Sequence, residues 1–121
     1  MTKPRLLIVE DSDLNRDLLV QIFEDAYEIE TAADGKSAIE AATSRKPDLI
    51  LMDIGLPGLS GLDAVKEIRS RGNGTPVVAV SSFVMPGDRE RAFEAGCDAF
   101  VVKPIDDLRL VALVEQMIGD R

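Results

Sequence analysis

Carboxylates mark the ends of two apolar segments in this chain. Glu10 and Asp11 follow the run LLIV at residues 6–9, and Asp53 follows the run LILM at residues 49–52. A short apolar run bounded by turn residues is typical of a strand buried on both faces. Ligands of an open parallel sheet bind beyond the carboxyl ends of its strands, where these acids would stand. For each acid alone, a simple cap or turn residue is the alternative, because Asp is common there.

Two further strand-like segments end on polar groups of other kinds. Residues 77–80 lead to Ser81 and Ser82, and residues 99–102 lead to Lys103. In a parallel sheet these groups would meet the carboxylates at one edge. Like charges 4 Å apart repel by about 4 kcal/mol at an effective dielectric near 20. Three neighbouring carboxylates would therefore need a cation, or would take up protons.

Phosphoryl transfer is the chemistry that fits these groups. An all-oxygen site with few protein ligands suits Mg²⁺, which keeps several waters and binds partly through phosphate oxygens. Lys103 supplies a second positive charge for the same phosphate. A carboxylate such as Asp53 can attack phosphorus and form an aspartyl phosphate, a reaction that needs positioning more than a strong base. The chain has no histidine, which excludes His-based triads and His metal ligands but is no obstacle here.

Strand and helix signals alternate regularly along the chain and would position these groups. Apolar runs predict strands, and apolar residues at helical spacing after Ser or Asp caps predict helices. The predicted strands are residues 6–9, 28–32, 48–52, 77–80 and 99–102. The first predicted helix is capped by Ser12 or Asp13 and runs from Leu14 to about Asp25. The other predicted helices are residues 37–44, 61–71, 88–95 and 105–118, with Asp34 and Gly35 in a turn before the second helix. This alternation predicts an α/β fold with a doubly wound, five-stranded parallel sheet, right-handed crossovers and five helices.

Length and composition narrow the class of protein. A chain of 121 residues suits one domain, which we expect to span residues 1–121. The formal net charge of −8 argues against nucleic acid bound through the overall field of the domain. The only cysteine, Cys97, excludes an internal disulfide and is expected to be a buried, inert thiol. No apolar stretch reaches the roughly 18 residues that would span a membrane. The first apolar run stops at Glu10, too early for a signal peptide, so we expect a cytoplasmic protein.

Four segments together resemble the receiver domain of two-component response regulators. They are LLIVEDSDLNR, KPDLILMDIGLPGLSGLDAV, PVVAVSS and GCDAFVVKPI, and they cover nearly the whole chain in the order and spacing of that family. The resemblance implies a flavodoxin-like and CheY-like sheet with strand order 2-1-3-4-5. The segment VSSFVMPGDRERAFEAGCDAF and the short chain are also similar to stand-alone, single-domain receivers of the DivK type.

The resemblance implies a role for each residue that matches a family motif. Asp53 matches the phosphoacceptor, and Glu10 and Asp11 match the acidic pair that holds Mg²⁺ together with it. Ser81 matches the hydroxyl that swings to bind the phosphoryl group, and Lys103 matches the lysine that contacts it. The remaining matches are Gly55, whose backbone carbonyl would be a metal ligand, Phe100, the aromatic switch, and Pro104, the residue after the lysine.

Some positions depart from the family pattern. Glu10 stands where Asp is commoner, which lengthens the reach to the metal. Ser82 stands where Ala is usual, so the backbone contact expected there is kept. Gly55 offers no side chain over the phosphoryl group, whereas Phe83, two residues after Ser81, is bulky. This combination does not predict the rate at which the aspartyl phosphate is hydrolysed.

The resemblance implies a phosphorylation-dependent signalling switch. It would accept a phosphoryl group from a histidine kinase or a histidine phosphotransfer protein and then alter its binding to a downstream effector protein. We expect no enzyme activity beyond its own phosphorylation and the hydrolysis of the aspartyl phosphate. Leu14 and Leu18, with Pro104 and Ile105, are candidates for docking the donor, and ordinary core positions are the equal alternative. A monomer is expected, with dimerisation on activation left open.

Other classes of protein share parts of the pattern. An unphosphorylated pseudo-receiver that acts only as an interaction module is one alternative, and a receiver portion of a larger regulator or hybrid kinase is another. The segment DGKS at residues 34–37 is similar to the end of a nucleotide-binding P-loop, but Glu30 stands where that motif needs glycine. An aspartyl phosphatase would need a second Asp at position 55, and the residue there is Gly55.

Overall fold

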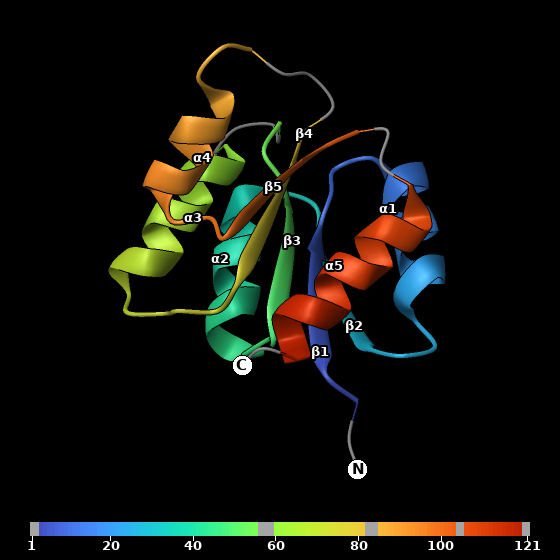
Figure 1. Ribbon diagram of the computed structural model, residues 1–121. Helices are drawn as coiled ribbons and strands as arrows, with labels where there is room; N and C mark the ends of the chain where they lie inside the picture. The colour runs from blue at the N-terminus through green and yellow to red at the C-terminus, as the bar shows by residue number, and fades with distance from the viewer. Residues whose placement is uncertain (1–2, 56–59, 82–84, 104–105, 120–121) are drawn as a thin grey trace.

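Strands and helices alternate along the part of the chain that the computed structural model describes, residues 3–55, 60–81, 85–103 and 106–119 (Figure 1). The strands are β1 (Arg5–Val9), β2 (Glu28–Ala32), β3 (Leu49–Asp53), β4 (Val77–Ser81) and β5 (Ala99–Val102). The helices are α1 (Asp13–Phe23), α2 (Gly35–Ser44), α3 (Gly61–Ser70), α4 (Asp88–Ala95) and α5 (Asp107–Gly119).

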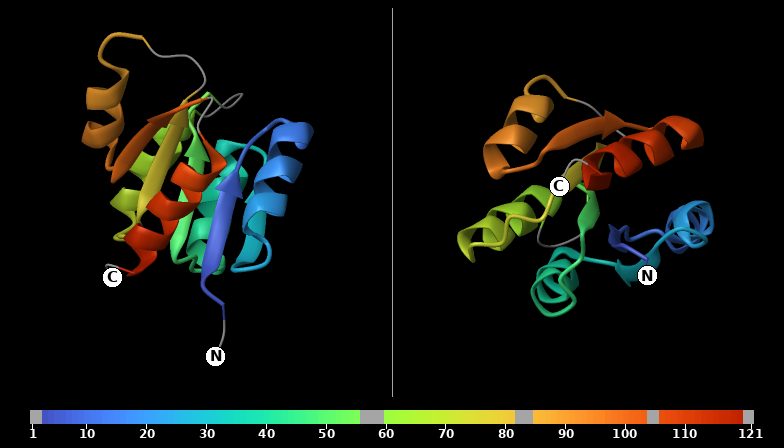
Figure 2. Two further views of the ribbon diagram at one scale, coloured as in Figure 1. Left: turned by 45° about the vertical axis from the view of Figure 1, so that its right-hand side comes forward. Right: turned by 60° about the horizontal axis from the view of Figure 1, so that its bottom comes forward.

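The strands form one parallel sheet between two layers of helices. The strand order is β2-β1-β3-β4-β5, and every neighbouring pair is parallel, as predicted. Helices α1 and α5 cover one face of the sheet, and α2, α3 and α4 cover the other (Figures 1 and 2). The carboxyl ends of all strands therefore lie at one edge, and both chain termini lie at the opposite end of the molecule (Figure 1).

The central strands are apolar because both of their faces are covered. Side chains alternate between the faces of a strand. Leu7 and Val9 accordingly pack into the core on the side of α2 and α3, whereas Leu6 and Ile8 pack into the core on the side of α1 and α5. Strand β2 lies at the sheet edge and is more exposed, which the polar and apolar alternation of its sequence predicts. No helix in the described ranges has the length and hydropathy required for a membrane span.

Several element boundaries differ from the prediction by one or two residues. Helix α2 begins at Gly35 and not at Ser37, since Asp34 is its N-cap and accepts a hydrogen bond of 2.8 Å from the backbone N–H of Ser37. This hydrogen bond lowers the pKa of the Asp34 carboxyl. Strand β3 includes Asp53 as its last residue, which places that carboxylate on the sheet itself. The predicted helix start at Ile105 lies outside the described residues.

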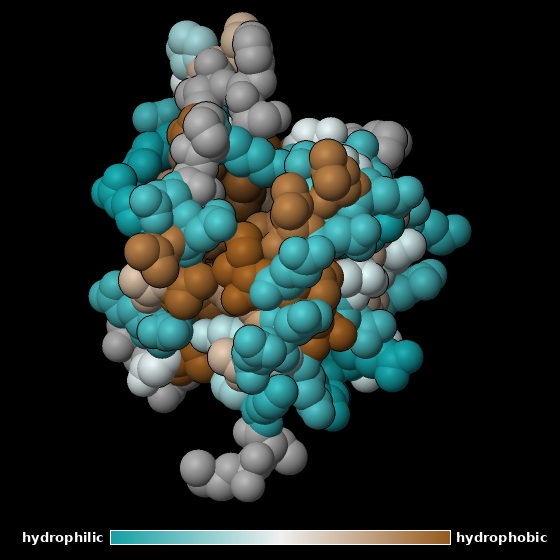
Figure 3. Space-filling model, turned by 90° about the vertical axis from the view of Figure 1, so that its right-hand side faces the viewer, coloured by the Kyte–Doolittle hydropathy of each residue, from teal (hydrophilic) through white to brown (hydrophobic). Residues whose placement is uncertain are grey.

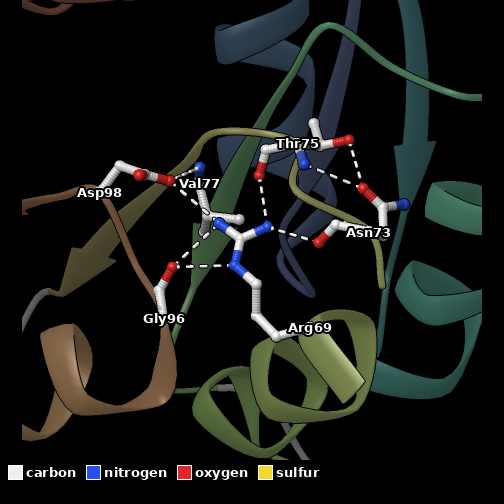
Figure 4. A network of polar contacts seen from close by, with 6 residues as sticks. All are labelled: Arg69, Asn73, Thr75, Val77, Gly96 and Asp98. Carbon is white, nitrogen blue, oxygen red and sulfur yellow. Dashed lines mark hydrogen bonds and ion pairs between the residues drawn. The ribbon is translucent and has the colours of Figure 1, made fainter. Parts of the chain in front are cut away.

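A partly buried arginine joins the amino-terminal ends of β4 and β5 to α3. The Arg69 side chain on α3 donates to the carbonyl oxygen of Gly96 through Nε at 3.0 Å and Nη2 at 2.9 Å (Figure 4). Its Nη1 donates to the carbonyl oxygens of Asn73 at 2.9 Å and Thr75 at 2.7 Å. Its Nη2 also forms an ion pair of 3.0 Å with Asp98. One guanidinium thus satisfies carbonyl groups from two separate loops.

Two further side chains extend this network to the neighbouring elements. The same Asp98 oxygen accepts a hydrogen bond from the backbone N–H of Val77 at 2.9 Å, which connects the starts of β5 and β4. The Asn73 side chain accepts from the N–H of Thr75 at 2.9 Å and donates to the carbonyl of Ala42, at the end of α2, at 3.1 Å. The loops at the amino-terminal end of the sheet are therefore held by side chains in addition to backbone pairing, such as the hydrogen bond of 2.8 Å from the N–H of Asp98 to the carbonyl of Val77.

The thiol of Cys97 lies next to this network and is buried, as expected. Cys97 is 5% exposed and belongs to the core on the side of α3 and α4. Burial disfavours the thiolate and raises the pKa of the Cys97 thiol from 9.0 to about 11, while Arg69 partly opposes this shift. The thiol is therefore protonated near neutral pH and is a poor nucleophile.

We expect Arg69→Met to lower the free energy of unfolding by about 3 kcal/mol, because the carbonyl oxygens that it binds would lose their donor, at about 1–3 kcal/mol for each group left unpaired. Arg71→Met is the matched control, since Arg71 is the C-cap of the same helix and its side chain makes an exposed pair with Glu67. Its effect should stay below about 0.5 kcal/mol. Urea unfolding followed by circular dichroism measures both, and equal losses would contradict the prediction.

We expect the Cys97 thiol to react with iodoacetamide only after unfolding near neutral pH. The folded state favours the protonated thiol, so its contribution to stability is complete below pH 9 and is lost as the pH rises toward about 11. The difference in free energy of unfolding between the wild type and Cys97→Ala should therefore fall across that range. A difference that stays constant with pH would show that the thiol ionises equally in both states.

Candidate functional site

Three carboxylates meet at the carboxyl ends of β1 and β3. Glu10 and Asp11 directly follow β1, and Asp53 is the last residue of β3. One oxygen from each of these three side chains lies within 4.8 Å of the other two. Asp11 and Asp53 are 42 residues apart in the sequence, and the parallel sheet brings them together. The structure thus gives the cluster that the sequence predicts at this edge.

Glu10 is held by three of its four polar backbone and side-chain atoms. Its backbone N–H donates to the carbonyl of Ala32 at 3.0 Å, and its own carbonyl accepts from Nη1 of Arg16 at 3.0 Å. Its Oε1 forms an ion pair of 2.8 Å with Nζ of Lys103. The Glu10 side chain is only 2% exposed, and its Oε2 has no hydrogen-bond partner among the described residues.

The donor set fits a divalent cation. A buried carboxylate oxygen without a partner is costly, since it has lost its water and gained nothing in exchange. Here that oxygen belongs to Glu10, which stands beside two further carboxylates. Mg²⁺ prefers oxygen ligands and is commonly held by one or two carboxylates together with waters. The residues present at this edge therefore suit Mg²⁺, as the sequence predicts.

Asp53 is fixed by the backbone of the two residues that follow it. The N–H of Gly55 donates to Asp53 Oδ1 at 2.9 Å, which sets the rotation of the carboxylate. The N–H of Ile54 donates to the carbonyl of Val80 at 3.1 Å and continues the pairing of β3 with β4. A Cβ atom at position 55 would lie 3.5 Å from Asp53 Oδ1, an ordinary contact. The role of the Gly55 carbonyl as a metal ligand stays a prediction.

Gly61 is a site residue that the sequence reasoning missed. It begins α3 after the N-cap Ser60, whose hydroxyl accepts a hydrogen bond of 3.2 Å from the N–H of Asp63. A Cβ atom on Gly61 would lie 2.4 Å from the carbonyl oxygen of Asp53 and 2.6 Å from Cα of Ile54. Only glycine lets α3 approach the phosphoacceptor candidate this closely. A poor helix former at the first helical position is the signal that could have revealed it.

The predicted hydroxyl and ammonium groups stand on the neighbouring strand ends. Ser81 is the last residue of β4 and is 4% exposed, and its carbonyl accepts a hydrogen bond of 2.7 Å from the N–H of Lys103. Lys103 follows β5, with its side chain 25% exposed. Phe100 pairs with Ala79 across β4 and β5 and is partly buried against the core. Pro104 lies outside the described residues, as do Ser82 and Phe83.

An apolar surface adjoins the acidic cluster. Leu14 and Leu18 on α1 are 69% and 49% exposed, so the alternative that they are ordinary core residues is wrong. Figure 3 shows apolar side chains gathered among polar ones on the face that carries α1 and α5. A cavity of about 480 Å³ opens between these two helices and reaches Glu10 and Lys103. Its apolar walls include Leu18, Leu19, Ile22 and Leu110.

The sequence matches the family model of the response regulator receiver domain over residues 6–115. Among curated proteins, it is 39% identical over 118 residues to the polar-differentiation response regulator DivK of Brucella anthropi, covering 95% of this chain and 96% of that protein. It is 40% identical over 123 residues to DivK of Brucella ovis, covering 99% of both.

Solved structures agree with these matches. The receiver domain of a sensor histidine kinase from Pseudomonas aeruginosa, which has a magnesium ion coordinated in its active-site cleft, superposes with a TM-score of 0.89 at 31% identity, covering 98% of this chain and 99% of that one. A chemotaxis response regulator of Vibrio cholerae superposes with a TM-score of 0.88 at 28% identity, covering 96% and 99%. The chain therefore belongs to the response regulator receiver domain family of two-component signalling, and it is DivK-like.

Proposed function

We propose that this chain is a phosphorylation-dependent switch in which Asp53 accepts a phosphoryl group from a histidine kinase or a histidine phosphotransfer protein. The observation that supports this most directly is the convergence of Glu10, Asp11 and Asp53 within 4.8 Å, with Lys103 bound to Glu10. This arrangement supplies a nucleophile, a site for a cation and a second positive charge in one place. The downstream response would come from altered binding to an effector protein.

The reaction is an in-line displacement at phosphorus. A carboxylate oxygen of Asp53 forms the new O–P bond while the P–N bond to the donor histidine breaks, and the electron pair of that bond goes to the imidazole nitrogen, which takes a proton from solvent. The Gly55 N–H holds Oδ1 of Asp53 and so orients the carboxylate for attack. The aspartyl phosphate carries up to about two negative charges in place of one.

Charge neutralisation supports the transfer. A Mg²⁺ ion held by Glu10, Asp11, Asp53 and the carbonyl of Gly55 would neutralise charge on the phosphoryl oxygens. Lys103 carries its ammonium on a flexible four-carbon stem, which lets it exchange the Glu10 oxygen for a phosphoryl oxygen. Ser81 and Lys103 are joined through their backbones, so both respond to the charge added at Asp53.

The switch is a shift between two conformations. The Ser81 hydroxyl moves to donate a hydrogen bond to the phosphoryl group and vacates space that Phe100 fills. Phe100 lies on β5, next to α4 in the chain, so the change extends to α4, β5 and α5. The phosphoryl group favours one state because only that state offers it the hydroxyl.

The exposed apolar surface of α1 is the proposed docking place for the donor. Leu18 lines the cavity that reaches Glu10 and Lys103, and the exposed Leu14 lies one turn before it on α1, so a donor seated there would present its histidine to the acidic cluster. Pro104 and Ile105 stay candidates for the same surface.

Further parts of the proposal rest on the family and on the sequence. The chain acts as a single domain over residues 1–121, is a cytoplasmic monomer at rest, and catalyses nothing beyond its own phosphorylation and the hydrolysis of the aspartyl phosphate. The matched family model covers residues 6–115, which supports a single domain. An interaction module that is never phosphorylated is the alternative, and the acidic cluster with its lysine speaks against it.

We expect Asp53→Asn to abolish acid-labile phosphate after the chain is mixed with a phosphorylated donor, because an amide cannot form the O–P bond. Asp25→Asn is the control, since Asp25 is an exposed acid in the turn after α1 and should leave labelling at the wild-type level. Transfer of labelled phosphate followed by gel autoradiography measures both. Undiminished labelling of Asp53→Asn would refute the assignment of the phosphoacceptor.

We expect beryllofluoride with Mg²⁺ to mimic the phosphoryl group and to shift the amide resonances of Ser81 and Phe100, because both belong to the proposed switch. The shifts should require Asp53 and disappear in Asp53→Asn. Two-dimensional amide NMR spectra with and without beryllofluoride make this measurement. Binding without any change near Phe100 would favour the interaction module over the switch.

A further inference from the structure

The Arg16 side chain spans the loop between β1 and α1. Its Nη1 donates to the carbonyl oxygen of Glu10 at 3.0 Å, and its Nη2 forms an ion pair with Asp13, one turn back on the helix. The Arg16 side chain is 21% exposed, whereas that of Asp13 is 88% exposed. An ion pair so exposed contributes little by itself. The contact with the Glu10 carbonyl is therefore the one that sets Arg16 apart from a surface arginine.

The two contacts enclose the part of the loop that carries Asp11. Glu10 and Asp13 flank Asp11 and Ser12 on either side, and the guanidinium connects both flanks. A planar guanidinium presents its donors in a fixed fork, so it can hold two acceptors at a set separation. The Ser12 hydroxyl accepts a hydrogen bond of 3.3 Å from the N–H of Asn15, which fixes the helix start within the same loop.

Among the described residues, the backbone carbonyl of Glu10 accepts a hydrogen bond from Arg16 alone. Its N–H is bound to Ala32 and its Oε1 to Lys103, so loss of Arg16 would leave the loop held on one side only. The orphan Oε2 of Glu10 and the carboxylate of Asp11 both depend on the path of this loop for their direction.

We infer that Arg16 is a positioning residue for the metal site, which fixes the loop so that the carboxylates of Glu10 and Asp11 converge on Asp53. This inference rests on the proposed function. The charge of Arg16 has the opposite effect, because a cation near the carboxylates repels a second cation. Truncation of Arg16 therefore distinguishes its charge from its positioning role by the direction in which the Mg²⁺ affinity changes. Loss of charge alone would tighten Mg²⁺ binding, whereas loss of positioning would weaken it.

The test is the Mg²⁺ affinity of wild type, Arg16→Ala and Arg16→Lys, measured by calorimetry and by titration of the Gly55 amide resonance. Removing a group that orients metal ligands typically weakens metal binding 10–100-fold, so we expect the dissociation constant of Arg16→Ala to rise about tenfold. Arg16→Lys keeps the charge and one donor, so we expect partial rescue, about threefold weaker than wild type. Affinity equal to or tighter than wild type in Arg16→Ala would overturn the inference.

Arg91→Ala is the matched control. Arg91 pairs with Asp88 at the start of α4 with the same spacing as Arg16 and Asp13, and its recorded contacts do not include the acidic cluster. Its Mg²⁺ affinity should equal that of the wild type. Thermal unfolding without Mg²⁺ shows whether each variant is folded. If Arg16→Ala does not fold, Arg16→Lys decides, and wild-type affinity in that variant would overturn the inference.

A kinetic readout separates positioning from a general loss of structure. Phosphorylation by acetyl phosphate is followed at increasing Mg²⁺ concentration. In Arg16→Ala we expect the Mg²⁺ concentration for half-maximal rate to rise about tenfold, with the rate at saturating Mg²⁺ close to that of the wild type. A lower saturating rate with an unchanged half-maximal concentration would overturn the inference. If the wild type itself binds no Mg²⁺, the proposed function fails. If the wild type binds Mg²⁺ and Arg16→Ala has the same Mg²⁺ dependence, the inference fails and the proposed function stands.

Discussion

The mutual repulsion of three carboxylates is the constraint on which the arrangement of this chain depends. Each pair at 4 Å costs about 4 kcal/mol at an effective dielectric near 20, and the sheet holds the three acids within 4.8 Å of one another. Such crowding persists only where the backbone leaves the side chains little freedom to move apart. The buried strands β1 and β3 provide that rigidity, because both of their faces are packed against helices.

The two ends of the sheet have different tasks. At the amino-terminal end, Arg69 and Asp98 connect the loops before β4 and β5 through side-chain hydrogen bonds. At the carboxyl end, the same two strands lead to Ser81 and Lys103, next to the acidic cluster. A charge added at Asp53, as proposed, would therefore act on the carboxyl ends of β4 and β5, whose amino-terminal ends are held by these hydrogen bonds. This favours a change that is largest near the site and in α4 and β5, over one that disturbs the whole sheet.

Much of this organisation follows from sequence, and what was missed depends on tertiary contacts. The alternation of apolar runs and helical spacing predicts the elements, and the strand-end rule brings Asp11 and Asp53 together. The strand order came from resemblance to the family and not from periodicity. Gly61 was missed because its need for glycine arises only where α3 meets the carbonyl of Asp53. Leu14 could not be separated from core residues, since helical spacing is the same for a buried face and a docking face.

The pairing of Lys103 was also beyond the sequence, and it bears on the departure at Glu10. The longer side chain brings Oε1 within 2.8 Å of the Lys103 ammonium while Oε2 stays without a partner among the described residues. Three carboxylates and one ammonium leave a net charge of −2, which matches a divalent cation. A monovalent ion would leave half of this net charge uncompensated. The two oxygens of Glu10 therefore differ: one pairs with the Lys103 ammonium, and the other is buried without a partner among the described residues, where a divalent cation would supply one.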